Sequence, residues 1–210
     1  MIAIIDYGMG NIHSVNKALQ VCGAKTVVTN NARDIRACVK AVLPGVGAFD
    51  DAMQELEKLG LVGPLLDHVR NKKPFLGICL GMQLLFEESE EAKMAKGLGV
   101  LEGKVRILQA NKDLKVPHMG WNQVRKSETR NPKSEKECPL LKDIPDDSFV
   151  YFCHSYYPEP KDWSVTAATC DYGLDFTCAV WKENVYGVQF HPEKSQKIGL
   201  KMLENFVKLC

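Results

Sequence analysis

The chain has 210 residues and a formal net charge of +1, with lysine and arginine spread along its length. The lack of a basic stripe argues against binding of nucleic acid, and no apolar segment approaches the about 20 residues of a membrane span. Eight scattered cysteines, with neither a CxxC pair nor a His/Cys cluster, argue against a zinc site and a disulfide framework. Without an export signal they predict free thiols in a reducing cytoplasm, in one domain over residues 1–210.

The first eighty residues alternate between apolar strands and amphipathic helices. A strand buried on both faces is predicted at 1–5, and a helix capped by Asn11 follows it. Further strands are predicted at 26–29, 41–43 and 73–78, and further helices around 48–59 and 64–72. This alternation predicts an α/β fold, a flavodoxin-like, doubly wound and mostly parallel sheet with helices on both faces.

The second half of the chain is dominated by strand-like segments, which predict antiparallel hairpins added to the edge or face of the sheet. These segments are 104–108, 121–125, 148–152, 163–169, 176–182 and 185–190. Residues 126–138 are nearly all polar and predict a surface loop. A terminal helix is expected after Ser195, its cap, with an apolar stripe of Ile198, Met202, Phe206 and Leu209.

A cysteine stands between two glycines where the strand at 73–78 turns directly into a helix, for which Leu80, Leu84, Leu85 and Phe86 supply the apolar spacing. Gly77 and Gly81 remove side chains that would clash in so tight a reversal. The pattern around Cys79 has the shape of a nucleophile elbow, with cysteine in place of serine. The alternative interpretation is an inert cysteine buried in a tight turn.

More than a hundred residues downstream, the alternating segment that begins at Tyr186 ends in His191-Pro192-Glu193. Pro192 cannot donate a ladder hydrogen bond, so the strand stops there. His191 then lies at the carboxyl end of a strand, where open α/β sheets gather their functional residues, and Glu193 is placed to hold its second ring nitrogen. The order cysteine, histidine, carboxylate suits a nucleophile, an acid/base and an orienting group, although order alone proves nothing.

Two shorter segments are weaker signals. Pro44-Gly45-Val46-Gly47 follows a predicted strand, and its N–H groups, with that of Leu80, suit an oxyanion hole; a plain turn is the alternative. The segment 152–157 ends a strand with histidine, serine and tyrosine side chains, which suit a small polar ligand but are as often structural.

Taken together, these motifs resemble the class I glutamine amidotransferases, and more narrowly the glutaminase subunits of imidazole glycerol phosphate synthase. The resemblance runs from residue 2 to the end of the chain. Its motifs are Asp6–Asn11, Pro44–Phe49, Gly77–Gln83, Pro117–Asn122, His154–Tyr156 and His191–Ser195. The first and fourth of these narrow the choice to the synthase subunits.

The resemblance implies that Cys79 attacks the side-chain amide of glutamine, while His191, held by Glu193, moves the proton to the leaving ammonia. It also implies an oxyanion hole and a set of substrate contacts, and neither a metal nor a cofactor is expected. The oxyanion residues are Gly45, Val46 and Leu80, and the substrate-binding residues are Gly47, Gln83, Ser155 and Tyr156, with Glu87 as a further helper.

The resemblance further implies a partner in trans, a (β/α)₈-barrel cyclase that uses the ammonia to make imidazole glycerol phosphate and an aminoimidazole carboxamide ribotide. The expected interface residues of this heterodimer are Asn11, Met119, Trp121 and Asn122. Because Gly45 permits a peptide flip, glutaminase activity is expected to stay low until the cyclase and its nucleotide bind.

Two other functions remain open on the sequence. The same glutaminase chemistry can feed another ammonia acceptor, such as a nucleotide-sugar amination system, with every catalytic residue unchanged. A non-enzymatic flavodoxin-like or redox-sensing domain needs only an oxidisable Cys79. The His-Pro-Glu and His-Ser-Tyr motifs argue against this last function, because oxidation requires neither.

Overall fold

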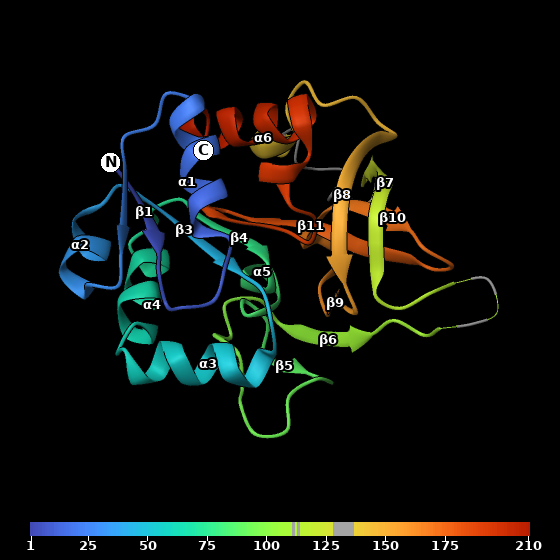
Figure 1. Ribbon diagram of the computed structural model, residues 1–210, viewed down its shortest axis with the longest axis horizontal. Coiled ribbons are helices and arrows are strands. Elements are labelled where there is room, and N and C mark those ends of the chain that lie inside the picture. Colours follow the sequence, from blue (N-terminus) through green and yellow to red (C-terminus); the bar gives the residue numbers. More distant parts are fainter. Residues whose placement is uncertain (111, 113, 128–136) are drawn as a thin grey trace.

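A computed structural model describes residues 1–110, 112, 114–127 and 137–210 (Figure 1). The described residues form a nine-stranded main sheet in the order β2-β1-β3-β4-β12-β11-β10-β7-β8. Its parallel strands are β1 (Ile2–Ile5), β2 (Thr26–Thr29), β3 (Lys40–Gly45), β4 (Phe75–Cys79) and β12 (Val185–Val188). The antiparallel strands are β11 (Asp175–Lys182), β10 (Thr166–Asp171), β7 (His118–Lys126) and β8 (Ser148–His154). The predicted parallel first half with added antiparallel strands is confirmed.

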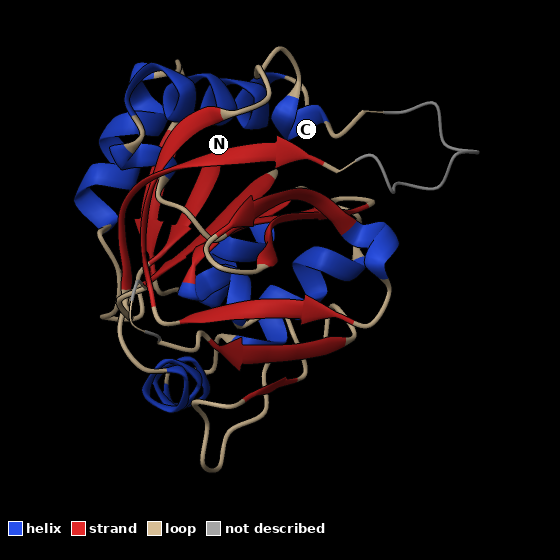
Figure 2. Cartoon of the chain, turned by 90° about the vertical axis from the view of Figure 1, so that its right-hand side faces the viewer, coloured by secondary structure: helices blue, strands red, loops and turns tan. Residues whose placement is uncertain are grey.

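Helices cover both faces of the main sheet (Figure 2). They are α1 (Ile12–Val21), α2 (Ala32–Ala37), α3 (Phe49–Lys58), α4 (Val62–Arg70), α5 (Leu80–Gln83) and α6 (Gln196–Lys208), with 3₁₀ turns η1 (Pro139–Leu141), η2 (Trp163–Val165) and η3 (Pro192–Lys194). The alternation of side chains along β1 divides the core: Ile2 and Ile4 belong to the cluster that contains α1 and α6, whereas Ala3 and Ile5 belong to the cluster that contains α3 and α4. None of the described helices combines the length and apolarity that a membrane crossing requires.

A second sheet of three strands, β5 (Glu88–Ser89), β6 (Gly103–Ile107) and β9 (Tyr156–Pro160), lies in the order β5-β6-β9. Strand β9 was not predicted, because Pro158 and Pro160 argue against a strand. It forms at an edge, where β6 is its only partner among the described strands and a missing N–H donor is tolerated. This strand begins at Tyr156, so it fixes one of the predicted substrate-binding residues.

The helix predicted to run through Leu84, Leu85 and Phe86 instead ends at Gln83. The carbonyl of Leu84 accepts the N–H of Leu98 at 2.8 Å, and that of Leu85 accepts the N–H of Val100 at 2.9 Å. These carbonyls are therefore not used by a further helical turn. The apolar side chains were correctly expected to be buried.

Three other predictions need correction or lie outside the description. The strand expected at 163–169 begins as η2, because the Asp162 side chain accepts the N–H of Ser164 at 2.9 Å and starts a 3₁₀ turn before β10. Leu209 lies beyond the end of α6 and is largely exposed, so it is not part of the apolar stripe. Most of the loop predicted at 126–138 lies outside the described residues. Helix α2 was not predicted.

Candidate active site

Cys79 lies at the junction of β4 and α5 with φ of 56° and ψ of −112°, a conformation that L-residues rarely adopt. The two flanking glycines permit it: a Cβ at Gly81 would overlap the Leu43 carbonyl oxygen, and one at Gly77 would meet the carbonyl of Gly81. The strained strand-to-helix turn expected from the sequence is therefore present. It presents the sulfur at the carboxyl end of the parallel strands.

His191 follows β12, the neighbour of β4, and its ring is almost fully buried. Its Nδ1 lies 2.9 Å from Oε1 of Glu193. Burial by itself lowers the pKa of His191, but hydrogen bonds to Cys79 and Glu193 and the charges of both raise it to about 10. The structure thus brings together the thiol, the imidazole and the carboxylate, and it favours an imidazolium beside Cys79.

The backbone of His191 is fixed by β8, through a serine that the sequence suggested as a helix cap. The hydroxyl of Ser195 makes no capping bond to α6. It donates to the carbonyl of His191 at 2.7 Å and accepts the N–H of Tyr151 at 3.0 Å. The N–H of His191 in turn donates to the carbonyl of Tyr151 at 2.9 Å. Ser195 therefore ties the histidine to the sheet.

A cavity of about 300 Å³ opens beside Cys79, a volume suited to a small ligand. Its lining comes from the ends of β3, β4 and β8, from α5, from the starts of β7 and β9, and from the segments that follow β5 and β12. The lining residues are Val46, Gly47, Cys79, Leu80, Gln83, Glu91, Pro117, Cys153, His154, Ser155, Tyr156, His191 and Lys194. Six of the residues predicted for the oxyanion hole or for substrate binding are among them.

Gly45 lies beside the nucleophile rather than on the cavity wall, in register with Cys79 across β3 and β4. A Cβ at Gly45 would lie 2.6 Å from the Tyr7 hydroxyl and 2.9 Å from the Cβ of Leu80, so only glycine fits there. The peptide between Gly45 and Val46 therefore runs past Cys79. The direction of its N–H group in the working enzyme stays a prediction.

Glu87 is not brought into the cavity, contrary to the expectation from sequence. Its carboxylate accepts the N–H of Gly103 at 3.0 Å and closes the turn into β6. Glu91 takes the place on the cavity wall, where its Oε2 accepts the N–H of Phe49 at the start of α3. Burial raises the pKa of Glu91, and the bond from Phe49 opposes that rise. The sequence offered no signal for this contact between distant segments.

A directed chain of hydrogen bonds links the cavity to strand β7. His154 has its Nδ1 2.9 Å from the carbonyl of Tyr156, so this nitrogen carries the proton and Nε2 is the acceptor. His118 Nδ1 then donates to that Nε2 at 3.0 Å, and Asn122 donates to His118 Nε2 at 3.3 Å. Both histidines are buried and neutral in this arrangement.

The two histidines predict a loss of stability in acid. Burial lowers the pKa of His118 to about 4 and that of His154 to about 3. Between the unfolded value of about 6.5 and these values, the unfolded chain binds protons that the folded chain excludes, so stability falls as pH falls. From pH 7 to 5 we expect each to cost about 2 kcal/mol of unfolding free energy, measured by urea titration. The His118→Phe variant, which keeps a ring between Phe152 and Tyr172, should show a shallower pH dependence; an unchanged slope would contradict this account.

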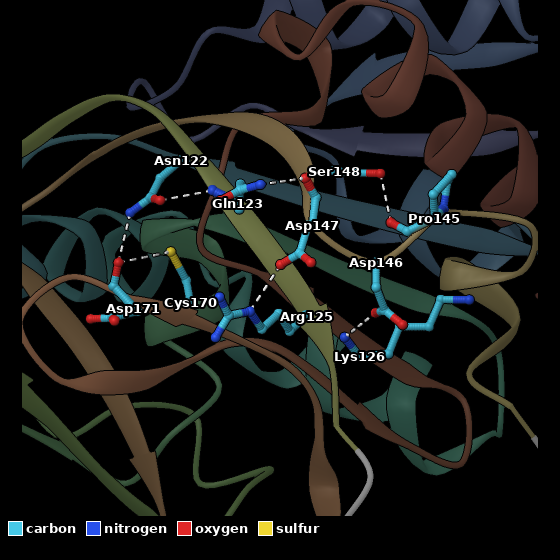
Figure 3. A network of polar contacts seen from close by, with 10 residues as sticks. All are labelled: Asn122, Gln123, Arg125, Lys126, Pro145, Asp146, Asp147, Ser148, Cys170 and Asp171. Atoms are coloured by element: carbon cyan, nitrogen blue, oxygen red, sulfur yellow. Dashed lines mark hydrogen bonds and ion pairs between the residues drawn. The ribbon is translucent and has the colours of Figure 1, made fainter.

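The residues predicted to face a partner differ in their exposure and in their contacts within the fold. Met119 and Trp121 are 62% and 46% exposed on β7. Asn122 is engaged within the fold: its Nδ2 also donates to the carbonyl of Asp171 at 2.8 Å, and Figure 3 shows it at one end of a polar network along β7. The side chain of Asn11 accepts the N–H of Ser14 and caps α1, as predicted.

Among the described residues, no group of three or more His, Cys, Asp or Glu side chains has the arrangement of a metal site. Two further lining residues, Lys194 and Cys153, lie within the sequence motifs but were given no role of their own. The ammonium group of Lys194 lies 5.8 Å from the centre of the Tyr151 ring, close enough for a cation–π contact.

Comparisons with known proteins agree with this geometry. The family model for class I glutamine amidotransferases matches residues 3–210. The chain is 49% identical over 210 residues to the imidazole glycerol phosphate synthase subunit HisH of Geobacter sulfurreducens, with 98% of this chain and 97% of that protein covered. It is 50% identical over 206 residues to the subunit HisH of Bacillus cereus, with 98% and 93% covered.

Solved structures show the same fold at low sequence identity. A crystal structure of a glutamine amidotransferase has a TM-score of 0.73 and 16% identity, with 99% of this chain and all of that chain covered. The structure of PurLQS from Thermotoga maritima has a TM-score of 0.70 and 16% identity, with 98% and 96% covered.

The chain therefore belongs to the class I glutamine amidotransferases, and it is an enzyme of that class. Within the class, its whole-length similarity places it among the HisH subunits of imidazole glycerol phosphate synthase, in histidine biosynthesis.

Proposed function

We propose that this chain acts in the cytoplasm, as one domain, to hydrolyse glutamine and pass the ammonia to a separate (β/α)₈-barrel cyclase. The observation that carries the proposal is the convergence of the Cys79 elbow with the paired side chains of His191 and Glu193 at one cavity. A redox-sensing role needs the thiol alone and leaves the buried imidazole–carboxylate pair without a use.

In the proposed reaction the sulfur of Cys79 attacks the side-chain amide carbon of glutamine, and the carbonyl oxygen becomes an oxyanion. His191, protonated by the transfer from the thiol, gives that proton to the leaving nitrogen, so ammonia departs and a glutamyl thioester remains. Water then attacks the thioester with His191 as base, which releases glutamate and restores the thiol. Glu193 keeps the imidazole oriented throughout.

The oxyanion is proposed to bind N–H groups of the Gly45–Val46 peptide and of Leu80, the first residue of α5. Each pre-organised donor of this kind lowers the activation free energy by about 3–4 kcal/mol. A peptide flip at Gly45 is the proposed switch between the low and high activity of the subunit.

The other cavity residues suit the two ends of the substrate. Glu91 offers a carboxylate to the α-ammonium group of glutamine, whereas the hydroxyls of Ser155 and Tyr156 suit its α-carboxylate. Both N–H groups of the Gln83 side chain are already used, so its carbonyl oxygen is the group that remains to accept a hydrogen bond from the substrate. Gly47, with φ of 98°, lets the chain approach the ligand where a side chain would meet Met9.

The surface proposed for the cyclase lies on β7, around the exposed Met119 and Trp121. A shallow hollow continues it, and the exposed Phe149 adds a further large apolar side chain there. The residues that line the hollow are Trp121, Phe149, Ser195, Gln196, Lys197 and Ile198. Large exposed apolar residues gathered in this way are typical of an interface. Asn122 connects this surface inward through His118 rather than serving as a free contact.

The test of the pairing is to mix the purified chain with the candidate cyclase and follow glutamate release. We expect turnover to rise by about a hundredfold when the cyclase and its nucleotide substrate are both present, because coupling of this kind is worth up to about 3 kcal/mol. The Trp121→Ala variant should need more cyclase for the same effect. Equal turnover with and without the liganded cyclase would contradict the pairing and leave another ammonia acceptor as the explanation.

A further inference from the structure

Gln189 is a fully buried amide beside the nucleophile, in a segment that otherwise reads as apolar strand. It follows β12 between Val188 and Phe190, both of which are buried. Its backbone N–H donates to the carbonyl of Cys178 at 2.8 Å, which fixes its position against β11. Its side-chain Nε2 lies 3.7 Å from the sulfur of Cys79, and its Oε1 lies 3.1 Å from Nε2 of Gln83.

The hydrogen-bond partners fix which end of the Gln189 amide faces the sulfur. Gln83 Nε2 lies 2.9 Å from the carbonyl of Tyr156, which can only accept, so the NH₂ group of Gln83 must be on that side. The same NH₂ group supplies its second hydrogen to Gln189, which must therefore present its oxygen to Gln83. The NH₂ group of Gln189 is then directed at Cys79.

We propose that Gln189 is a catalytic residue of the glutaminase reaction, whose side-chain N–H group donates a hydrogen bond to the sulfur of Cys79 and stabilises it as the thiolate. The proposal rests on the proposed function, in which Cys79 is the nucleophile. Gln83 acts as a positioning residue, since it holds the Gln189 amide in the donating orientation.

The surroundings of the sulfur explain why a donor is needed there. The backbone carbonyl of Cys153 lies 3.9 Å from the sulfur and accepts a hydrogen bond only from the protonated thiol. An acceptor so placed favours the thiol, and the N–H group of Gln189 opposes it. The titratable groups that face the sulfur are the imidazole of His191, which is hydrogen bonded to it, and the buried phenol of Tyr7. The His191 imidazolium balances the charge of the thiolate, and the N–H group of Gln189 adds a donor that offsets the carbonyl of Cys153.

The chemistry of the position points the same way. A buried primary amide costs free energy unless its polar atoms are hydrogen bonded, and Val188 and Phe190 show that this segment is otherwise built from apolar side chains. A methionine of similar size would fill the space without that cost. The Gln189 amide offsets that cost through the hydrogen bonds of its N–H group to Cys79 and of its oxygen to Gln83.

The test is the rate of Cys79 alkylation by iodoacetamide as a function of pH, in the isolated full-length chain. Iodoacetamide reacts with the thiolate, and mass spectrometry of the peptide that contains Cys79 separates it from the other cysteines. For Gln189→Met we expect the midpoint of the profile to rise by about one pH unit and the rate at pH values below that midpoint to fall about tenfold, as for the loss of one hydrogen bond to a charged group. The kcat for glutamine should fall with little change in KM.

A matched control and a second variant complete the experiment. Thr177→Val removes a buried hydrogen-bonding group of β11, paired with Thr166 at 3.0 Å, and should keep the wild-type alkylation profile. Gln83→Met leaves Gln189 without its orienting donor and should raise the midpoint by a smaller amount. A Gln189→Met profile that coincides with the wild type would overturn the proposal, and if that variant does not fold, an unchanged Gln83→Met profile would do so.

The outcome is independent of whether the proposed function is correct. Alkylation reports the state of the sulfur without any turnover of glutamine. If glutamate release does not depend on Cys79, the proposed function fails on its own, whatever the alkylation profiles show.

Discussion

Replacing Cys79 with alanine is expected to reduce glutamate release by at least about a thousandfold, because no thioester can form without the sulfur. The elbow conformation at residue 79, with φ of 56°, is already adopted by cysteine, which has a Cβ atom as alanine does. The fold should therefore survive. The measurement is glutamate release in the presence of the cyclase and its nucleotide, together with a thermal melt of the variant.

The matched control is Cys22→Ser. Cys22 lies at the end of α1, where its sulfur donates to the carbonyl of Leu200 at 3.4 Å, and a serine hydroxyl can make the same bond. This variant should retain wild-type turnover. Turnover retained by Cys79→Ala would remove the covalent mechanism.

Changing Glu193 to glutamine is the second large effect, with kcat expected to fall by about a thousandfold or more. The carboxylate, 1% exposed, holds Nδ1 of His191 and helps to raise the pKa of the imidazole to about 10. A neutral amide removes that contribution, so the pKa of His191 falls and the imidazolium loses its proton at a lower pH. The alkaline limb of the pH–rate profile should therefore move to lower pH, measured from kcat across the pH range.

The same variant separates orientation from binding. Glu193 is not among the residues that line the cavity, so KM for glutamine should change little while kcat falls. A large rise in KM with unchanged kcat would mean that the carboxylate binds substrate rather than orienting the histidine.

The nucleophile elbow could be predicted because its causes are local. The strained backbone at Cys79 and the close approach of Gly77 and Gly81 follow from a strand that turns into a helix within a few residues. The same holds for the pairing of His191 with Glu193 two residues later. The strand predicted to continue up to Pro192 ends earlier, because β12 stops at Val188. The confirmed parallel first half of the sheet likewise follows from the alternation of strands and helices.

Contacts between distant segments could not be predicted in this way. The sequence does not distinguish Glu87 from Glu91 as a residue of the cavity wall. The difference comes from their hydrogen-bond donors, because Glu87 accepts the N–H of Gly103 and Glu91 accepts that of Phe49. In the sequence, Gln189 is a single polar residue in a predicted strand. Its proposed role depends on Gln83, which orients the Gln189 amide. Ser195 has the sequence position of a cap, but its hydroxyl instead accepts the N–H of Tyr151 on β8 and donates to the carbonyl of His191.

The most direct test of the whole account is to mix the chain with glutamine and the liganded cyclase, quench in acid during turnover, and determine the mass of every cysteine peptide. The account predicts the added mass of a glutamyl group on the peptide that contains Cys79, lost when the peptide is treated with hydroxylamine. Steady release of glutamate with that peptide unmodified, and the adduct on another cysteine such as Cys153, would contradict it.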